Sequence, residues 1–196
     1  TETGRLSSSS NPRGTGTNLQ NQDHECLDMY LPNEGQVLMG LDLSQAEDRW
    51  VKVIAYANRG LVKEIDCDWE EVLWRAQSKP WENDEHWRAA DAIYGLPRDQ
   101  MSKALHRQMG KRTRHAVNYD MHAGRHAEEL AKSDVYITET EASDMLNRLL
   151  LTDPYIEVYQ ASRRREVMQN RKLINTWGRE YWFDMDLLDD EAYRRA

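Results

Sequence analysis

One segment of this 196-residue chain has the alternation of a good β-strand, and this most constrains the fold. Val37, Met39, Leu41 and Leu43 would share one face of a buried strand over residues 36–43. Elsewhere, apolar side chains mostly recur at three- and four-residue spacing, which is typical of amphipathic helices. We therefore expect an α+β fold that is predominantly helical.

Local signals predict where the helices begin. Ser44 and Glu47 have the spacing of a capping box, as do Thr138 and Glu141 further along the chain. Gly110 is unfavourable inside the long basic helix that we expect over residues 98–120. Other helices are expected within residues 64–74, 84–95, 121–131 and 155–170, followed by an extended segment at 172–176 and a turn at 177–179.

Composition excludes several classes of protein. No run of 18 apolar residues occurs, which excludes a transmembrane helix, and no secretory signal is present at the start. Cys26 and Cys67 show no metal-finger spacing and cannot form a disulfide framework. We expect a cytoplasmic protein without a membrane partner. Residues 1–36 have a loop composition, and the start at Thr1 suggests a piece of something longer.

A basic island interrupts an acidic chain. The net charge is −8, yet residues 98–125 hold seven Lys and Arg side chains against two Asp. A localised island suits a phosphate site better than a long nucleic-acid stripe. A solvated helix face explains the charge equally well.

Within this island, Arg107, Lys111, His115 and Tyr119 recur every four residues. On a helix they would form a winding stripe roughly 18 Å long, and Arg114 and Arg125 would point within about 20° of Arg107. Two cations one turn apart can hold the phosphates of a nucleotide, and an aromatic ring further along can stack on its base or sugar. Alternatively, these cations pair with acidic residues on the surface.

Two further features could bind a metal. Asp42 stands at the end of the predicted strand, where a rigid support presents a carboxylate, although it can also be a simple polar strand end. His122 and His126 lie four residues apart, but no third ligand is marked. We interpret these two as ordinary histidines on a helix surface.

Five segments follow one another in a meaningful order. They are Thr3-Gly4-Arg5-Leu6-Ser7-Ser8-Ser9 with Asn18-Leu19-Gln20-Asn21; Asp42-Leu43-Ser44-Gln45-Ala46-Glu47-Asp48-Arg49; Asp84-Glu85-His86 with Ile93-Tyr94-Gly95; the row from Arg107 to Tyr119; and Asn175-Thr176-Trp177-Gly178-Arg179. In this order they resemble the TGRLSS…NLQN, DYSQIELR (motif A), DIH…IFG, RxxxKxxx(F/Y)xxxYG (motif B) and TLxGRRR segments of family A DNA polymerases. That family includes bacterial DNA polymerase I and many phage replicases.

The resemblance implies a partial polymerase palm, with a short antiparallel sheet, and a helical fingers subdomain. Residues 1–60 would be palm with motif A, 61–171 fingers helices with motif B, and 172–196 a return toward the palm that stops before motif C. The parent would be a DNA-directed DNA polymerase that transfers nucleotides from dNTPs to a primer 3′-OH. The thumb and motif C would come from the same polymerase or a second subunit, so we expect this fragment alone to be inactive.

The resemblance also implies roles for individual residues. Asp42, with the backbone carbonyl of Leu43 nearby, would help to hold two Mg²⁺ ions, whose second carboxylate ligand is not in this chain. Arg107 and Lys111 would hold the triphosphate, and Lys111 would protonate the leaving pyrophosphate. Glu47 would crowd the 2′ position of the sugar. The other nucleotide-binding residues would be His86, Gln45, His115 and Tyr119. The residues touching primer–template DNA would be Arg5, Asn18, Gln20, Asn21 and Arg179.

Three positions depart from the family pattern. His115 replaces Phe or Tyr, Asp120 replaces the glycine after the motif B tyrosine, and Leu43 replaces an aromatic residue. Two alternatives stay open: a single-subunit RNA polymerase, against which Glu47 argues, and a non-catalytic, helical nucleic-acid-binding remnant of a polymerase.

Overall fold

The computed structural model describes residues 29–39, 43–62, 65–175 and 178–183. They belong to two compact units, residues 1–42 and residues 43–196. In the first unit, the Gln36 N–H donates to the Asn33 carbonyl over 3.0 Å and closes a turn. Val37 and Met39 are exposed and form no strand. The buried strand predicted for 36–43 is therefore wrong over 36–39, because the described residues of this unit offer nothing to pair with or pack against it; positions 40–42 lie outside the described residues.

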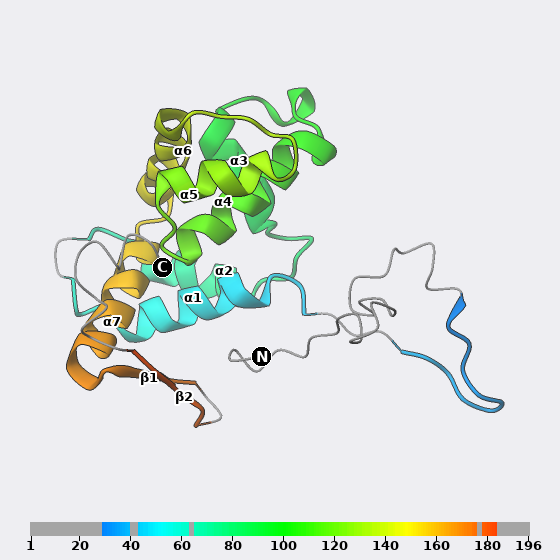
Figure 1. The fold of residues 1–196 in the computed structure, drawn as a ribbon, viewed down its shortest axis with the longest axis horizontal. Helices are drawn as coiled ribbons and strands as arrows, with labels where there is room; N and C mark the ends of the chain where they lie inside the picture. Colours follow the sequence, from blue (N-terminus) through cyan, green and yellow to red (C-terminus); the bar gives the residue numbers. More distant parts are fainter. Residues whose placement is uncertain (1–28, 40–42, 63–64, 176–177, 184–196) are drawn as a thin grey trace, which may run out of the picture. The chain divides into compact units, whose positions relative to one another are not determined.

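The second unit is predominantly helical, as predicted (Figure 1). A small antiparallel hairpin follows the last helix, with Leu173 opposite Tyr181. The described elements are α1 (Ala46–Ala57), α2 (Trp69–Gln77), α3 (Glu85–Tyr94), the 3₁₀ turn η3 (Arg98–Gln100), the π-helical η4 (Lys103–Arg107), α4 (Gln108–Asn118), α5 (Ala123–Ala131), α6 (Glu139–Thr152), α7 (Tyr155–Asn170), β1 (Lys172–Ile174) and β2 (Glu180–Trp182).

The capping predictions had different outcomes. The capping box of Thr138 and Glu141 is present at the start of α6. The box predicted for Ser44 and Glu47 is wrong, because α1 begins after Gln45, whose φ of 56° is left-handed and whose side chain makes no cap. The Glu47 carboxylate instead contacts Tyr119 and His115 of the α4 segment, so its oxygens are engaged there and not in a cap.

The basic segment is not one continuous helix. A 3₁₀ turn and a π-helical turn precede α4, and such π turns often occur near functional sites. Gly110 lies inside α4, where α3 packs closely against it. A Cβ at Gly110 would lie 2.2 Å from the His86 carbonyl oxygen and 2.7 Å from the Ala90 nitrogen. The glycine that disfavours the helix locally is therefore required for the approach of α3.

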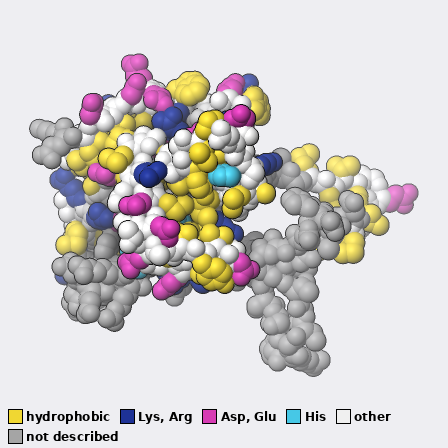
Figure 2. Space-filling model, turned by 90° about the horizontal axis from the view of Figure 1, so that it is seen from above, with side chains coloured by type: hydrophobic (Ala, Val, Ile, Leu, Met, Phe, Trp, Pro, Cys, Tyr) yellow, Lys and Arg dark blue, Asp and Glu magenta, His cyan; other side chains and the backbone are white. Residues whose placement is uncertain are grey.

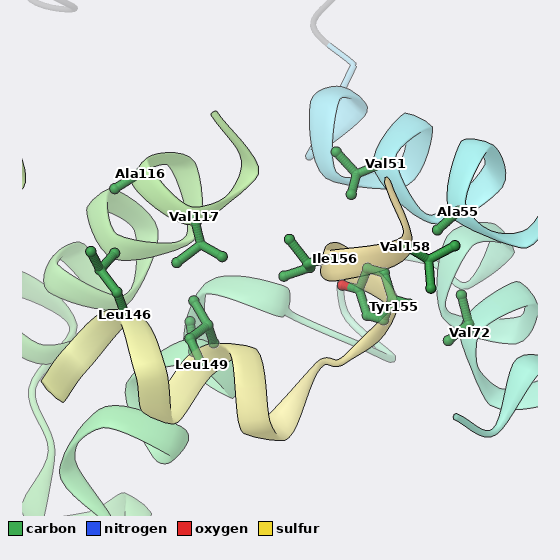
Figure 3. Packing of buried hydrophobic residues seen from close by; sticks show 11 residues of the cluster. Val51, Ala55, Val72, Ala116, Val117, Leu146, Leu149, Tyr155, Ile156 and Val158 are labelled. Atoms are coloured by element: carbon green, nitrogen blue, oxygen red, sulfur yellow. The ribbon is translucent and has the colours of Figure 1, made fainter. Parts of the chain in front are cut away.

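The apolar core lies between α1, α2, α4, α6 and α7 (Figure 3). Tyr155, Ile156 and Val158 of α7 are in its middle, between side chains of α1 and α2 and side chains of α4 and α6. Fully buried alanines such as Ala55 and Ala89 let the helix backbones approach closely. No helix among the described residues has the length and apolar character needed to cross a membrane.

We predict that Gly110→Ala destabilises the second unit. The added methyl group must displace backbone of α3, and overpacking of this kind costs about 1–3 kcal/mol. Gly124→Ala is the matched control, because a Cβ there meets its nearest atom, in the Glu139 side chain, at an ordinary 3.4 Å. Urea unfolding followed by circular dichroism should show a loss for the first variant and a gain of up to ~1 kcal/mol for the second. Equal stability of the two variants would contradict the close α3–α4 approach.

Candidate functional site

A network of charged side chains lies inside the second unit. Each of its six members is at most 5% exposed, and they come from α1, α2, α3, α4 and the α6–α7 junction. The members are Asp48, Lys52, Arg75, Glu85, Arg114 and Asp153. Buried charges are costly unless they are paired and hydrogen-bonded, so the contacts of this network decide whether the helices can pack.

Arg114 is at the centre of this network. It forms an ion pair with Asp153, its Nη2 lies 3.4 Å from Glu85 Oε2, and its Nε lies 3.6 Å from Asp48 Oδ1. Its Nη1 donates to the Tyr155 hydroxyl over 3.3 Å. One guanidinium thus joins α4 to α1, α3 and the junction before α7.

Arg75 makes the second set of contacts. Its guanidinium donates to both oxygens of Glu85, over 2.9 and 2.6 Å, and to Asp153 Oδ1 over 2.6 Å. Lys52 pairs with Asp48 and lies 3.2 Å from Glu85. Three carboxylates therefore share three cations, and each carboxylate contacts at least two of them.

The network sets the charge state of its members. Burial alone would raise the pKa of Glu85, but the hydrogen bonds from Arg75 and the charges of Lys52 and Arg114 outweigh it and lower that pKa to about 2. Burial opposes the charged form of Asp153 as well, yet the nearby Arg114 and Arg75 hold its pKa well below the usual range. Both carboxylates are ionised at neutral pH.

Three network members are sequence neighbours of expected site residues. Asp48 follows Glu47, Glu85 precedes His86, and Arg114 precedes His115. Successive side chains of an α-helix point about 100° apart, so burying one member directs its neighbour toward the rim of the packed helices. The buried network therefore fixes the positions of Glu47, His86 and His115.

These neighbours converge at the rim. The Tyr119 hydroxyl donates to one Glu47 oxygen over 2.9 Å, and His115 Nδ1 lies 3.1 Å from the other oxygen. The His86 and His115 rings are 6.2 Å apart. Gln45 accepts from the backbone N–H of Glu85 over 3.3 Å. The structure thus brings together residues that the sequence separates by up to 72 positions.

Arg107 and Lys111 occupy the start of the same row. Arg107 binds Asp84, the N-cap residue of α3, over 2.9 Å. Lys111 and its neighbour Arg112 are half-buried, and no carboxylate lies within 4.0 Å of either among the described residues. Both cations line a pocket of about 390 Å³ that also borders His115 and Tyr119. The remaining lining residues are Gln108, Ala116, Met121, His126, Glu129, Leu130 and Ser133, from α4, α5 and the adjoining loops.

His86 is neutral at physiological pH. Burial, and then the positive charge of Arg107, lower its pKa to about 4 against the opposing effect of Asp84. Its Nδ1 is buried without a hydrogen-bond partner among the described residues. A neutral imidazole here can exchange hydrogen bonds with a ligand, but it adds no charge to the cations of Arg107 and Lys111.

Arg114 is fully buried, at the centre of the charged network. One expectation for this region was wrong. His126 is not on the surface: it is buried, and its Nε2 lies 3.2 Å from Thr113 Oγ1. His122 caps α5 by accepting from the N–H of Arg125.

Leu43 and Arg179 are the remaining predicted site residues that the structure describes. Leu43 is described and exposed. Arg179 is in the hairpin, where its guanidinium lies 5.4 Å from the Tyr181 ring centre. Within the described part of the chain, no group of three or more His, Cys, Asp or Glu side chains could hold a metal. The predicted residues Asp42, Arg5, Asn18, Gln20 and Asn21 lie outside the described residues.

The buried network itself was missed from the sequence, although one signal was available. Asp48, Val51, Lys52 and Ala55 follow the spacing i, i+3, i+4 and i+7, which is that of one helix face. All four are buried. Two opposite charges within an otherwise apolar face indicate a buried ion pair.

Comparison with known proteins does not indicate a function for this chain. No protein-family model matches this chain, and no curated protein shows significant similarity to it.

We predict that acid weakens the folded state progressively below about pH 6.5. The pKa of His86 is lowered from 6.5 to about 4, so the unfolded chain takes up this proton first and stability falls between those values. The pKa values of Glu85 and Asp153 are also lowered, so the stability from their pairing is present above about pH 4.5 and is lost as pH falls further. Thermal unfolding between pH 8 and 3 measures this, and a flat melting temperature would contradict it.

We predict that removing one carboxylate of the buried network destabilises the folded state at neutral pH. Glu85→Gln leaves Arg75 and Lys52 without a full counter-charge, and breaking a buried pair in this way costs about 3–5 kcal/mol. Glu128→Gln is the control, because that carboxylate is on the surface and its pair with Arg125 is exposed. Urea unfolding at pH 7 should separate the two variants clearly; similar stabilities would show that the network contributes little.

Proposed function

We propose that this chain forms the dNTP-binding part of a family A-like DNA polymerase, whose complete form transfers nucleotides from dNTPs to a primer 3′-OH under direction of a template. One observation carries the proposal. Lys111, a cation without a carboxylate partner among the described residues, lines a pocket beside the cluster of Glu47, His115 and Tyr119.

The charge distribution supports an anionic ligand. Lys111 and Arg112 are half-buried in a chain of net charge −8, yet the abundant acidic residues do not neutralise them within the described residues. On the face shown in Figure 2, Lys and Arg side chains are interspersed with Asp and Glu. Such a surface suits a local phosphate site better than a broad electrostatic contact. Lys111 would bind a phosphate as a point charge, and Arg107 would bind a second one a helical turn away.

The remainder of the site supports a nucleoside attached to those phosphates. His115 and Tyr119 offer aromatic surfaces along the row, and Ala116, Met121 and Leu130 add apolar lining. Glu47 is fixed beside them, where a carboxylate would crowd the 2′ position of a sugar. His86 would accept or donate one hydrogen bond without contributing charge.

The convergence of three segments favours a polymerase over a remnant without catalytic function. Gln45 and Glu47 of the motif A-like segment, His86, and the motif B-like row meet at one place. A module that binds only a nucleic-acid backbone has no need of a carboxylate held by the tyrosine and histidine of this row. The remnant is therefore the second choice, and nucleotide binding separates the two.

Magnesium binding is proposed only from the sequence resemblance. The described residues offer no metal cluster, and Asp42 lies outside them. The DNA contacts proposed for Arg5, Asn18, Gln20, Asn21 and Arg179 also rest on the sequence resemblance.

We predict that Lys111→Ala weakens binding of a dNTP to this chain. Loss of a charge-assisted contact costs roughly 1.5–3 kcal/mol, which is about 10- to 150-fold in dissociation constant. Titration calorimetry with dATP in the presence of Mg²⁺ measures the change. Lys79→Ala is the control, because that lysine is exposed, lies over the Trp81 ring and does not line the pocket. Absence of dATP binding to the unmodified chain, or equal binding by both variants, would refute the proposal.

A further inference from the structure

We infer that Asp84 is a positioning residue that holds Arg107 away from the pocket, and that the phosphates of a bound dNTP take Arg107 from it. This inference rests on the proposed function and concerns the regulation of the same site. One of the two cations expected to bind phosphate is engaged by a carboxylate of this chain until the nucleotide displaces that carboxylate.

The side chain of Arg107 is turned toward α3. Its Nε and its Nη2 each lie 2.9 Å from Oδ2 of Asp84, so a carboxylate occupies one edge of the guanidinium. Lys111 lines the pocket, whereas Arg107 is not among the described residues that do so. The two cations therefore differ in state. Lys111 has no carboxylate within 4.0 Å among the described residues, and the charge of Arg107 is balanced by Asp84.

The backbone before α4 has an irregular turn at Arg107. This residue is the last of the π-helical η4, and α4 begins at Gln108. The N–H groups of His106 and Arg107 both donate to the Ser102 carbonyl, over 3.0 and 3.3 Å. Single π turns of this kind are frequent at functional sites. The change in helical spacing lets Arg107 face α3 while Lys111 borders the pocket.

Asp84 stays stabilised when Arg107 leaves it. Asp84 is the N-cap residue of α3, and its Oδ1 accepts from the N–H groups of His86 and Trp87 over 3.0 and 3.3 Å. A negative charge at this end of a helix is also favoured by the helix dipole. Because the cap uses the other oxygen, release of Arg107 removes only the contact at Oδ2.

A phosphate can compete with Asp84 for Arg107. The side chains of Arg107 and Asp84 are 21% and 25% exposed, so water screens this ion pair in part. A triphosphate held by Lys111 carries more negative charge than one carboxylate, and phosphate oxygens accept the forked hydrogen bonds of a guanidinium. Competition between the two anions lowers the affinity for the nucleotide, so removing the carboxylate should raise that affinity.

The test measures dissociation constants for dATP, with Mg²⁺, by titration calorimetry in variants of the 196-residue chain. Asp84→Ser keeps a good N-cap for α3 but removes the charge that holds Arg107. It should tighten dATP binding by up to about fivefold, the size of a solvent-screened ion pair. Asp68→Ser is the matched control and should not change the dissociation constant. Asp68 caps α2 through the N–H groups of Glu70 and Glu71, and no cation lies within 4.0 Å of it among the described residues.

Two further variants separate the proposed cause from other effects. Asp84→Asn also retains a cap without the charge, so it should give the same gain in affinity. In an Arg107→Ala background, Asp84→Ser should change dATP binding by less than about twofold, because the cation that it would release is gone. A gain of full size in that background would show that Asp84 acts only as a nearby negative charge, and would overturn the inference.

The remaining outcomes distinguish this inference from the proposed function. If neither Asp84→Ser nor Asp84→Asn binds dATP more tightly, the inference is overturned and the proposed function stands. Failure of the unmodified chain to bind dATP overturns both. A second readout needs no nucleotide: the ¹⁵N signal of Arg107 Nε should shift in Asp84→Ser but not in Asp68→Ser. An unshifted signal in Asp84→Ser overturns the contact itself.

Discussion

The burial of Arg114 is the constraint on which the rest of the second unit depends. A guanidinium that is 1% exposed can be accommodated only if carboxylates reach it, and here they come from α1, α3 and the α6–α7 junction. Sliding any one of these helices by a turn would leave a buried charge without its partner, at a cost of several kcal/mol. Apolar contacts among alanines and valines tolerate such slips far better, so the charged network specifies the register that the small side chains cannot.

The register of these helices also sets the positions of the side chains at the rim of the unit. In each of α1, α3 and α4 a buried charged residue has a less buried neighbour in the sequence. The pairs, with the buried residue first, are Asp48 and Glu47 in α1, Glu85 and His86 in α3, and Arg114 and His115 in α4. Gly110 adds the close approach of α3 that lets the His86 ring reach His115. Site geometry and folding stability are therefore set by the same buried contacts.

Local sequence signals predicted most of the helices, because caps and breakers act within a few residues. The capping box of Thr138 and the αL glycine that ends α3 at Gly95 are such signals. The prediction at Ser44 was wrong because the Glu47 carboxylate has partners 68 and 72 residues away, which no local pattern reveals. The four-residue row spans the π-helical η4 and α4, and the burial of Arg114 depends on which helices cover α4. Tertiary contacts thus decided the cases that local chemistry left open.

Two side chains at the end of the row from Arg107 to Tyr119 connect it to neighbouring helices. Asp120 stands where the family pattern has glycine, and its φ of 55° is a conformation that glycine adopts freely and aspartate tolerates. Its carboxylate pairs with Arg164 of α7, which supplies an interaction that glycine cannot make. His115 likewise makes a polar contact to Glu47 of α1. The row is therefore held to α1 and α7 by side chains at its exposed end, in addition to the network beneath it.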